Sequence, residues 1–203
     1  MPKSDLHNAK GGVKILLLVV VIFAGGVWYG VEHGWFNEVG SDRTLDVIAR
    51  QRQEEQQTRA QTSEKIASTE YSELFKSDKY KFSLSYPEGL TVTNFSDGNG
   101  ETFLFQDSSA KVGFQIYVSP LEDTSVKTIT KELILKDIPD MVISEDQPVL
   151  IGEGGIGVAF VETSGGEKRR QVWFSMAGNL YQITAPIESD GLLQKVINGW
   201  GFY

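Results

Sequence analysis

The sequence predicts an α+β domain, mainly an antiparallel β-sheet with helices packed against it, preceded by an N-terminal transmembrane helix and a polar stalk. Three observations support this architecture. An apolar run at residues 13–31 is followed by a stretch rich in Arg, Gln and Glu. Beyond residue 77, short alternating segments separated by turn residues are typical of strands, and two later segments have helical spacing. The 203 residues leave room for one ordinary domain besides these segments.

Composition narrows the chemistry that this domain can carry out. The chain has 27 acidic and 19 basic side chains, two histidines and no cysteine. Without cysteine, disulfides, thiolate metal sites and cysteine nucleophiles are excluded. His7 and His33 both precede the domain, which excludes histidine-dependent catalysis within it. A net charge of −8 argues against nucleic acid as a partner. We therefore assign no catalytic, cofactor-binding or metal-ligating residue and predict no cofactor and no nucleotide.

Residues 13–31 read VKILLLVVVIFAGGVWYGV and predict a membrane anchor. Nineteen helical residues span about 29 Å, close to the thickness of the hydrocarbon core of a bilayer. Lys14 lies near one end, where its side chain can reach the interface, and Trp28 and Tyr29 lie near the other as interfacial anchors. This segment is the predicted contact with membrane lipid.

The charges around the anchor predict its orientation. Lys3 and Lys10 precede it, whereas Glu32 and Glu38 follow it, so residues 1–12 form a cytoplasmic tail and the rest lies outside the membrane. Two alternatives remain open. A signal peptide could be cleaved near residues 24–26, although apolar residues continue past that point, and a pilin-like leader could end at residues 11–12, although a leucine stands where pilins carry glutamate.

Residues 32–76 predict a polar helical stalk. Residues from Thr44 to about Lys65 are mostly good helix formers. Leu45 and Ile48 begin an apolar stripe, but charged side chains occupy its continuation at positions 52, 55 and 59. A coiled coil needs its apolar seam over several heptads. The stalk is therefore predicted to be a solvated spacer, with a self-association helix near the membrane as the alternative.

Residues 77–203 predict the extracytoplasmic domain. Its first strands are predicted as an antiparallel meander and are followed by a helix at 125–138, with Thr124 or Ser125 as its N-cap and Pro139 as its stop. A second helix at 189–198 places four apolar side chains on one face. The predicted strands are 80–86, 90–95, 102–106, 112–118, 149–151, 158–162, 171–176 and 180–185.

Several of these segments resemble PsbP-like domains. The resemblance is carried by Tyr80-Lys81-Phe82-Ser83, by Tyr86-Pro87-Glu88-Gly89, by the hairpin residues 179–184 and by the terminal helix leading to Trp200-Gly201-Phe202. It covers residues 78–203 and neither the anchor nor the stalk. It implies an α-β-α sandwich and a protein-binding role without enzymatic activity. It transfers no functional residue to this chain.

Two local motifs have the composition of ligand sites. Asp97-Gly98-Asn99-Gly100-Glu101 places oxygen-bearing side chains at alternate positions, as a calcium loop does, but Thr102 and Ser108 stand where an EF-hand needs glycine and glutamate. A hairpin turn is the prediction, with calcium binding left open. Residues 152–157 resemble a phosphate-binding loop but lack its Lys-Ser/Thr pair and precede a strand, which argues against nucleotide binding.

Three further groups of side chains have an alternative interpretation. Lys168-Arg169-Arg170 is predicted to be a solvated turn, with contact to an anionic headgroup or cell wall as the alternative. Trp173, Phe174, Tyr181 and Trp200 are predicted to be core, with an exposed aromatic platform as the alternative. Glu145, Asp146 and Glu153 are the carboxylates that a hydrolase would have to bring into one cleft.

The sequence thus predicts a single-pass cell-membrane protein whose extracytoplasmic domain binds a protein partner and has no catalytic activity. Two other functions stay open, namely a carboxylate-dependent extracytoplasmic hydrolase and a cell-wall or ligand-binding protein. Residues 34–203 contain no histidine, no cysteine and no convincing metal-binding or nucleotide-binding motif, which favours the binding module.

Overall fold

A computed structural model describes residues 42–68, 70–109 and 112–203. The predicted cytoplasmic tail at 1–12 and membrane anchor at 13–31 lie outside these residues. Within the described ranges, none of the helices is long and apolar enough to cross a membrane.

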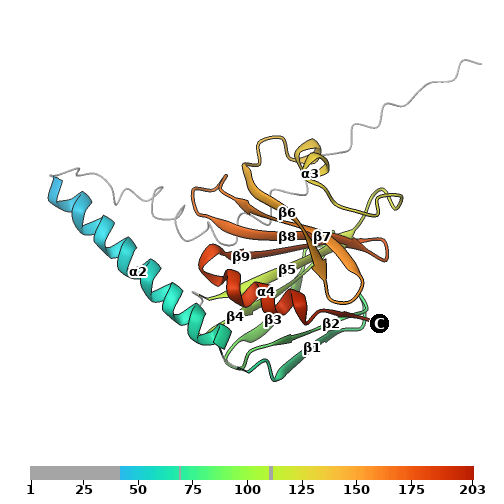
Figure 1. The fold of residues 1–203 in the computed structure, drawn as a ribbon, viewed down its shortest axis with the longest axis horizontal. Helices are drawn as coiled ribbons and strands as arrows, with labels where there is room; N and C mark the ends of the chain where they lie inside the picture. The colour runs from blue at the N-terminus through green and yellow to red at the C-terminus, as the bar shows by residue number, and fades with distance from the viewer. Residues whose placement is uncertain (1–41, 69, 110–111) are drawn as a thin grey trace, which may run out of the picture.

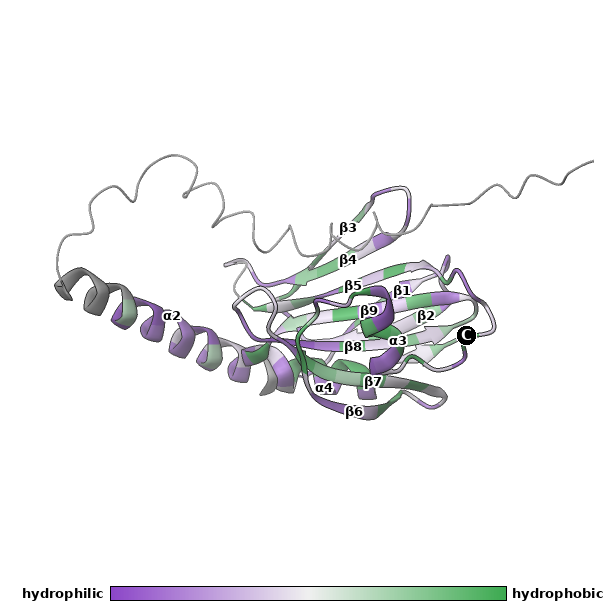
Figure 2. Ribbon diagram, turned by 90° about the horizontal axis from the view of Figure 1, so that it is seen from above, coloured by the Kyte–Doolittle hydropathy of each residue, from purple (hydrophilic) through white to green (hydrophobic). Residues whose placement is uncertain are grey.

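The described part of the predicted stalk starts with one helix, α2 (Asp42–Ser68), which projects from the domain (Figure 1). Figure 2 shows that polar residues dominate it. Its last turns contact the C-terminal helix α4 and the preceding 3₁₀ helix, and Ser63 is buried there. Beyond α2, the Tyr71 hydroxyl donates to the carbonyl of Leu192 at 3.3 Å, and Lys195 lies 5.3 Å from the Tyr71 ring centroid. The C-terminal part of this helix is therefore packed on the domain and is not a solvated spacer.

The domain is built on a seven-stranded sheet in the order β3-β4-β5-β9-β8-β7-β6, and every neighbouring pair is antiparallel. This confirms the α+β class with a mainly antiparallel sheet. The strands are β3 (Thr91–Ser96), β4 (Glu101–Gln106), β5 (Gly113–Pro120), β6 (Ile143–Ile151), β7 (Gly155–Glu162), β8 (Arg169–Met176) and β9 (Asn179–Pro186).

A second, three-stranded sheet packs against the first and contains the strand predicted at 80–86, so the predicted meander holds for β3, β4 and β5 only. Its order is β1-β2-β10, with β1 (Glu73–Ser77), β2 (Phe82–Tyr86) and β10 (Gly201–Phe202). Apart from Ser77, β1 lies inside the range 32–76 that was predicted as stalk. It gives little strand signal because Leu74 is exposed and only Phe75 packs against the core. β10 has two residues, too few for any periodicity to indicate a strand.

The main core lies between the two sheets and α4 (Asp190–Asn198), which follows the 3₁₀ helix η1 (Ile187–Ser189). Helix α4 buries Leu192, Leu193, Val196 and Ile197, the face predicted from its spacing. Trp200 stacks on Phe82 with ring centroids 4.7 Å apart, so the end of the chain closes the core.

The opposite face of the large sheet carries α3 (Lys131–Asp137), as Figures 1 and 2 show. The helix predicted at 125–138 thus begins six residues later, at Lys131, with Thr130 as its N-cap. Its start is displaced because Asp123 Oδ1 accepts a hydrogen bond from the Ser125 amide at 2.9 Å. This local turn competes with helix formation. The large sheet is thus covered by α3 on one face and by α4 together with the small sheet on the other.

Candidate functional site

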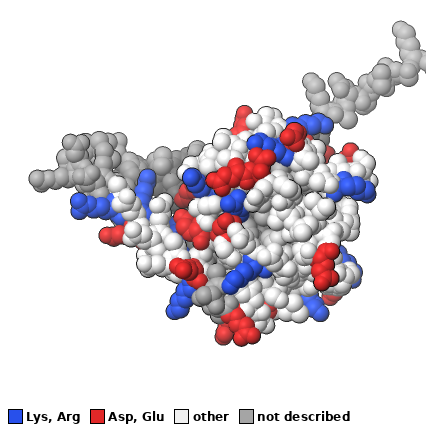
Figure 3. Space-filling model, viewed as in Figure 1, with Lys and Arg blue, Asp and Glu red and all other residues white. Residues whose placement is uncertain are grey.

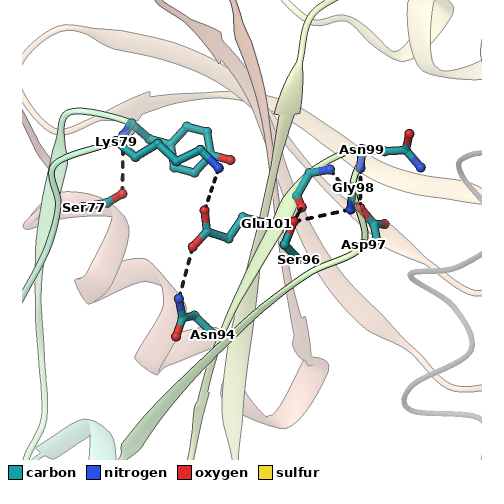
Figure 4. Close-up of polar contacts among 10 residues, drawn as sticks. Ser77, Lys79, Asn94, Ser96, Asp97, Gly98, Asn99 and Glu101 are labelled. Atoms are coloured by element: carbon teal, nitrogen blue, oxygen red, sulfur yellow. Dashed lines mark hydrogen bonds and ion pairs between the residues drawn. The ribbon is translucent and has the colours of Figure 1, made fainter.

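The Asp97–Glu101 segment forms the β3–β4 hairpin turn. Asp97 Oδ1 accepts the backbone amides of Asn99 at 2.9 Å and Gly100 at 2.8 Å (Figure 4). The Ser96 hydroxyl donates to the Gly100 carbonyl at 2.8 Å. These bonds use the Asp97 carboxylate to order the turn, which is the common role of Asp at such positions.

Glu101 points away from Asp97 toward the loop after β1 (Figure 4). Its Oε2 lies 3.0 Å from Lys79 Nζ, and its Oε1 accepts from Asn94 Nδ2 at 3.1 Å. Burial raises the pKa of Glu101, but the hydrogen bonds from Lys79 and Asn94 outweigh it and lower that pKa below its usual value. The acidic side chains of the hairpin do not converge, and the described residues contain no group of three His, Cys, Asp or Glu able to hold a metal ion.

The glycines at 152–157 connect β6 to β7 and allow close approach of main chains. Gly152 has a φ of +52° and donates its amide to the Ile197 carbonyl at 3.1 Å. A Cβ on Gly152 would lie 1.8 Å from the Trp200 carbonyl oxygen, and one on Gly157 would lie 2.7 Å from that of Trp173. The segment therefore packs against the end of the chain instead of opening toward a phosphate.

The basic cluster at 168–170 is not a single solvated turn, because Arg169 and Arg170 belong to β8. Arg170 Nε donates to Asp190 Oδ1 at 3.0 Å and its Nη2 donates to Oδ2 at 3.4 Å. Its Nη2 also lies 3.6 Å from Glu145 Oε2. The Arg170 charge is thus shared with two carboxylates and ties β8 to α4 and β6.

The three carboxylates considered for hydrolysis lie in different environments. Glu145 pairs with Arg170, and Asp146 Oδ1 lies 2.7 Å from Lys131 Nζ. That hydrogen bond lowers the pKa of Asp146, whereas a general acid needs a raised one. Glu153 lies apart from this pair, in the β6–β7 turn. These residues do not form a paired catalytic site.

The four aromatic residues considered for a platform are buried. Trp173 packs with Phe160 on the α3 side, and the other three lie in the main core. The Tyr181 hydroxyl donates to the Tyr80 carbonyl at 3.0 Å, and burial raises the pKa of Tyr181 to about 12. The predicted core interpretation therefore describes all four.

One end of the large sheet carries an exposed apolar surface that sequence reasoning missed. Leu150 on β6 and Ile156 on β7 are directly opposite in register, with 71% and 54% of their surfaces exposed. Two half-open grooves of about 570 and 440 Å³ adjoin each other there and share Gly154 and Met176. We call this region the hairpin-end surface; it consists of the two grooves together with Leu150, Gly154, Ile156 and Met176.

Distant segments assemble this surface. The larger groove is lined by the β6–β7 turn, Met176 and residues 198–202, and the smaller one by residues from the 121–128 loop and the β8–β9 turn. The only local signal is an apolar residue on each side of the 152–154 turn, namely Leu150 and Ile156. Such a signal is too common to identify a site.

Comparison with known proteins gives limited matches. No protein-family model matches the chain, and no curated protein matches it. The solution structure of cyanobacterial PsbP (CyanoP) from Synechocystis sp. PCC 6803 is similar with a TM-score of 0.49 and 10% identity, over 64% of this chain and 92% of that one.

A crystal structure from Bacteroides thetaiotaomicron VPI-5482 is similar with a TM-score of 0.44 and 17% identity, over 66% of this chain. The chain spans about half of that protein, 49% of its length. Both are likenesses in backbone arrangement, and neither assigns an activity or a residue role to this chain.

Proposed function

We propose that this protein is a membrane-anchored accessory module without catalytic activity, whose domain binds another protein through the hairpin-end surface. The observation that carries the proposal is the pairing of Leu150 and Ile156, which are both exposed and directly opposite on adjacent strands. Burying a Leu or Ile side chain contributes about 1.5–3 kcal/mol. A partner that covers this pair would gain a large part of that free energy from both residues.

The shape of the surface favours a macromolecule over a small ligand. The two grooves are half-open and follow the tips of two hairpins and the end of the chain. Small-molecule sites are usually concave and bury most of their ligand. An apolar centre bordered by polar groups such as Glu153, Asn198 and Lys127 is instead typical of a protein interface.

The charge distribution favours a defined partner. Residues 70–203 contain 19 acidic and 11 basic side chains, a net charge of −8, so the globular part holds the whole net charge of the chain. On the face shown in Figure 3, Lys and Arg are scattered among Asp and Glu. A net negative domain is repelled by anionic lipid and nucleic acid, which disfavours nonspecific adhesion.

The proposed location is the cell membrane, with one span at residues 13–31, the N-terminus in the cytoplasm and the domain outside. The apolar run and the lysine bias of the sequence support it. The 27 residues of α2 extend about 40 Å, and the part of this helix that precedes its contact with α4 would hold the domain away from the bilayer. Protease added to intact cells should therefore degrade residues beyond 34, and protection until lysis would contradict this topology.

The binding site is tested by photo-crosslinking of the full-length chain in native membranes. A photoreactive residue at Ile156 should capture one recurrent protein. The matched control is Val142, which is equally exposed at 54% but precedes the opposite end of β6. Leu150→Glu should abolish the Ile156 adduct without unfolding the domain, because Leu150 is exposed.

Two results would contradict the proposal. The first is an identical pattern of adducts from positions 156 and 142. The second is turnover of a glycan or ester by the purified protein that is lost on substitution of a single Asp or Glu, since that would make the protein a carboxylate-dependent hydrolase.

A further inference from the structure

The two edges of the seven-stranded sheet differ in how they are protected. β3 and β6 are its edge strands and lie at opposite sides of the sheet. Unpaired main-chain groups on an edge strand can pair with another chain, and proteins usually block them with charge, proline or a bulge. The edge strand that lacks these features is the one open to a partner.

β6 has all three protective features. Pro148 lacks an amide donor, and Glu145 and Asp146 place charges on the strand. The register to β7 shifts between Ser144 and Gln147, where Glu145 has a φ of +52°. A continuous ladder of hydrogen bonds along this edge is therefore prevented.

β3 has none of them. Its sequence, TVTNFS, contains no charged residue and no proline, and it pairs with β4 without a register shift from Thr91 to Ser96. Five of its six residues are exposed. Its uncharged, partly β-branched composition suits strand pairing.

The register shows which main-chain groups face outward. The Asp97 amide donates to the Gly100 carbonyl across the hairpin. In an antiparallel pair, the main-chain groups that bond to the neighbouring strand belong to every second residue, so those of every second residue before Asp97 face β4. The amides and carbonyls of Val92 and Asn94 consequently face away from the sheet. Within the described part of the chain, no hydrogen bond involves these outward groups.

The hairpin that presents this edge is fixed at its tip. Asp97 and Ser96 order the turn, and Glu101 links Asn94 to Lys79 beyond β1 (Figure 4). An ordered edge loses little conformational entropy on binding. Phe95, which is 38% exposed, adds apolar contact area beside it.

We propose that β3 accepts an extended segment of a partner protein as an eighth strand of the sheet. The main chain of Val92 and Asn94 supplies the hydrogen bonds, as in other cases of strand addition. The incoming segment is uncharged where it pairs and carries Lys or Arg beside that stretch, because Glu88 and Asp97 flank β3 and the domain carries a net charge of −8. This site is separate from the hairpin-end surface, so the module can hold two protein segments at once.

The test uses the full-length chain in native membranes with a photoreactive residue at Phe95. Asn94→Pro and Asn94→Ala both lose the side-chain hydrogen bond to Glu101, but only Asn94→Pro also loses the outward-facing main-chain amide of residue 94. Asn94→Pro should reduce the Phe95 adduct at least about tenfold, because proline removes the donor and places its ring at the edge. Asn94→Ala should retain the adduct, and the captured peptide should be an uncharged stretch with Lys or Arg beside it.

Adducts from Ile156 separate this proposal from the proposed function. They should persist in Asn94→Pro, because β3 and β6 are opposite edges. If Asn94→Pro does not fold, Thr93→Lys against Thr93→Val provides the same comparison, since lysine protects edge strands and valine favours pairing. Three results would each overturn the proposal. The first is an equal amount of Phe95 adduct in both members of each matched pair. The others are Phe95 adducts only to a second copy or to residues 1–41, and the absence of a Phe95 adduct while Ile156 captures a protein.

Discussion

Substitution of Gly152 by alanine probes the contact that closes the main core. The new Cβ would lie 1.8 Å from the Trp200 carbonyl oxygen, so the β6–β7 turn has to move away from the chain end. The φ of +52° costs a non-glycine residue about 1 kcal/mol. Displacement of the turn breaks the hydrogen bond from the Gly152 amide to the Ile197 carbonyl, about 1 kcal/mol more. With loosened packing of Trp200, we expect a loss of about 3 kcal/mol in the free energy of unfolding.

The assay is thermal unfolding of the purified protein, followed by near-ultraviolet circular dichroism. A loss of this size should lower the Tm by about 10 °C for a domain of this length. Gly154→Ala is the control in the same turn, because its Cβ would meet nothing within 4 Å. It should change the Tm by less than about 3 °C. If the two variants melt within about 2 °C of each other, the contact between Gly152 and Trp200 does not stabilise the core.

Two further predictions concern hydrogen bonds of the domain. Tyr181→Phe leaves the Tyr80 carbonyl without its donor and should lower the free energy of unfolding, measured by urea titration, by about 1 kcal/mol. Tyr203→Phe removes an exposed hydrogen bond to Asp78 and should change that free energy by almost nothing. Because the pKa of Glu101 is lowered in the folded state, its contribution is present above the ordinary value of 4.5 and is lost as pH falls through the lowered pKa. The Tm difference between wild type and Glu101→Gln should therefore shrink between pH 6 and pH 3, and a constant difference would contradict this role for Glu101.

Elements with a continuous apolar pattern could be predicted from the sequence. The face of α4 was predicted correctly because its apolar side chains recur at helical spacing and all face one core. The strands β5, β8 and β9 were found for a related reason, since alternate residues of each strand pack against the main core. In these segments local preference and tertiary packing agree.

Other elements depend on contacts that the local sequence does not contain. β1 and β10 are strands because β2 lies between them, although the two are more than 120 residues apart. Residues 125–130 have helical spacing, yet Asp123 orders a turn there and Val126 and Ile129 pack against the large sheet without forming a helix. Here side-chain hydrogen bonding and burial outweigh the periodicity.

The candidate surfaces were harder to predict because whether a strand lies at an edge, where a partner can reach it, depends on the order of strands in the sheet. Pro148 and the charges of β6 are visible in the sequence, and so is their absence from residues 91–96. Neither observation indicates a binding edge until the order β3-β4-β5-β9-β8-β7-β6 shows that both segments are edge strands. In a central strand, uncharged β-branched residues only favour pairing that already exists, whereas at an edge the same residues leave donors and acceptors available to another chain. The topology therefore makes Thr91–Ser96, rather than Ile143–Ile151, the edge of the seven-stranded sheet that is better suited to receive a partner strand.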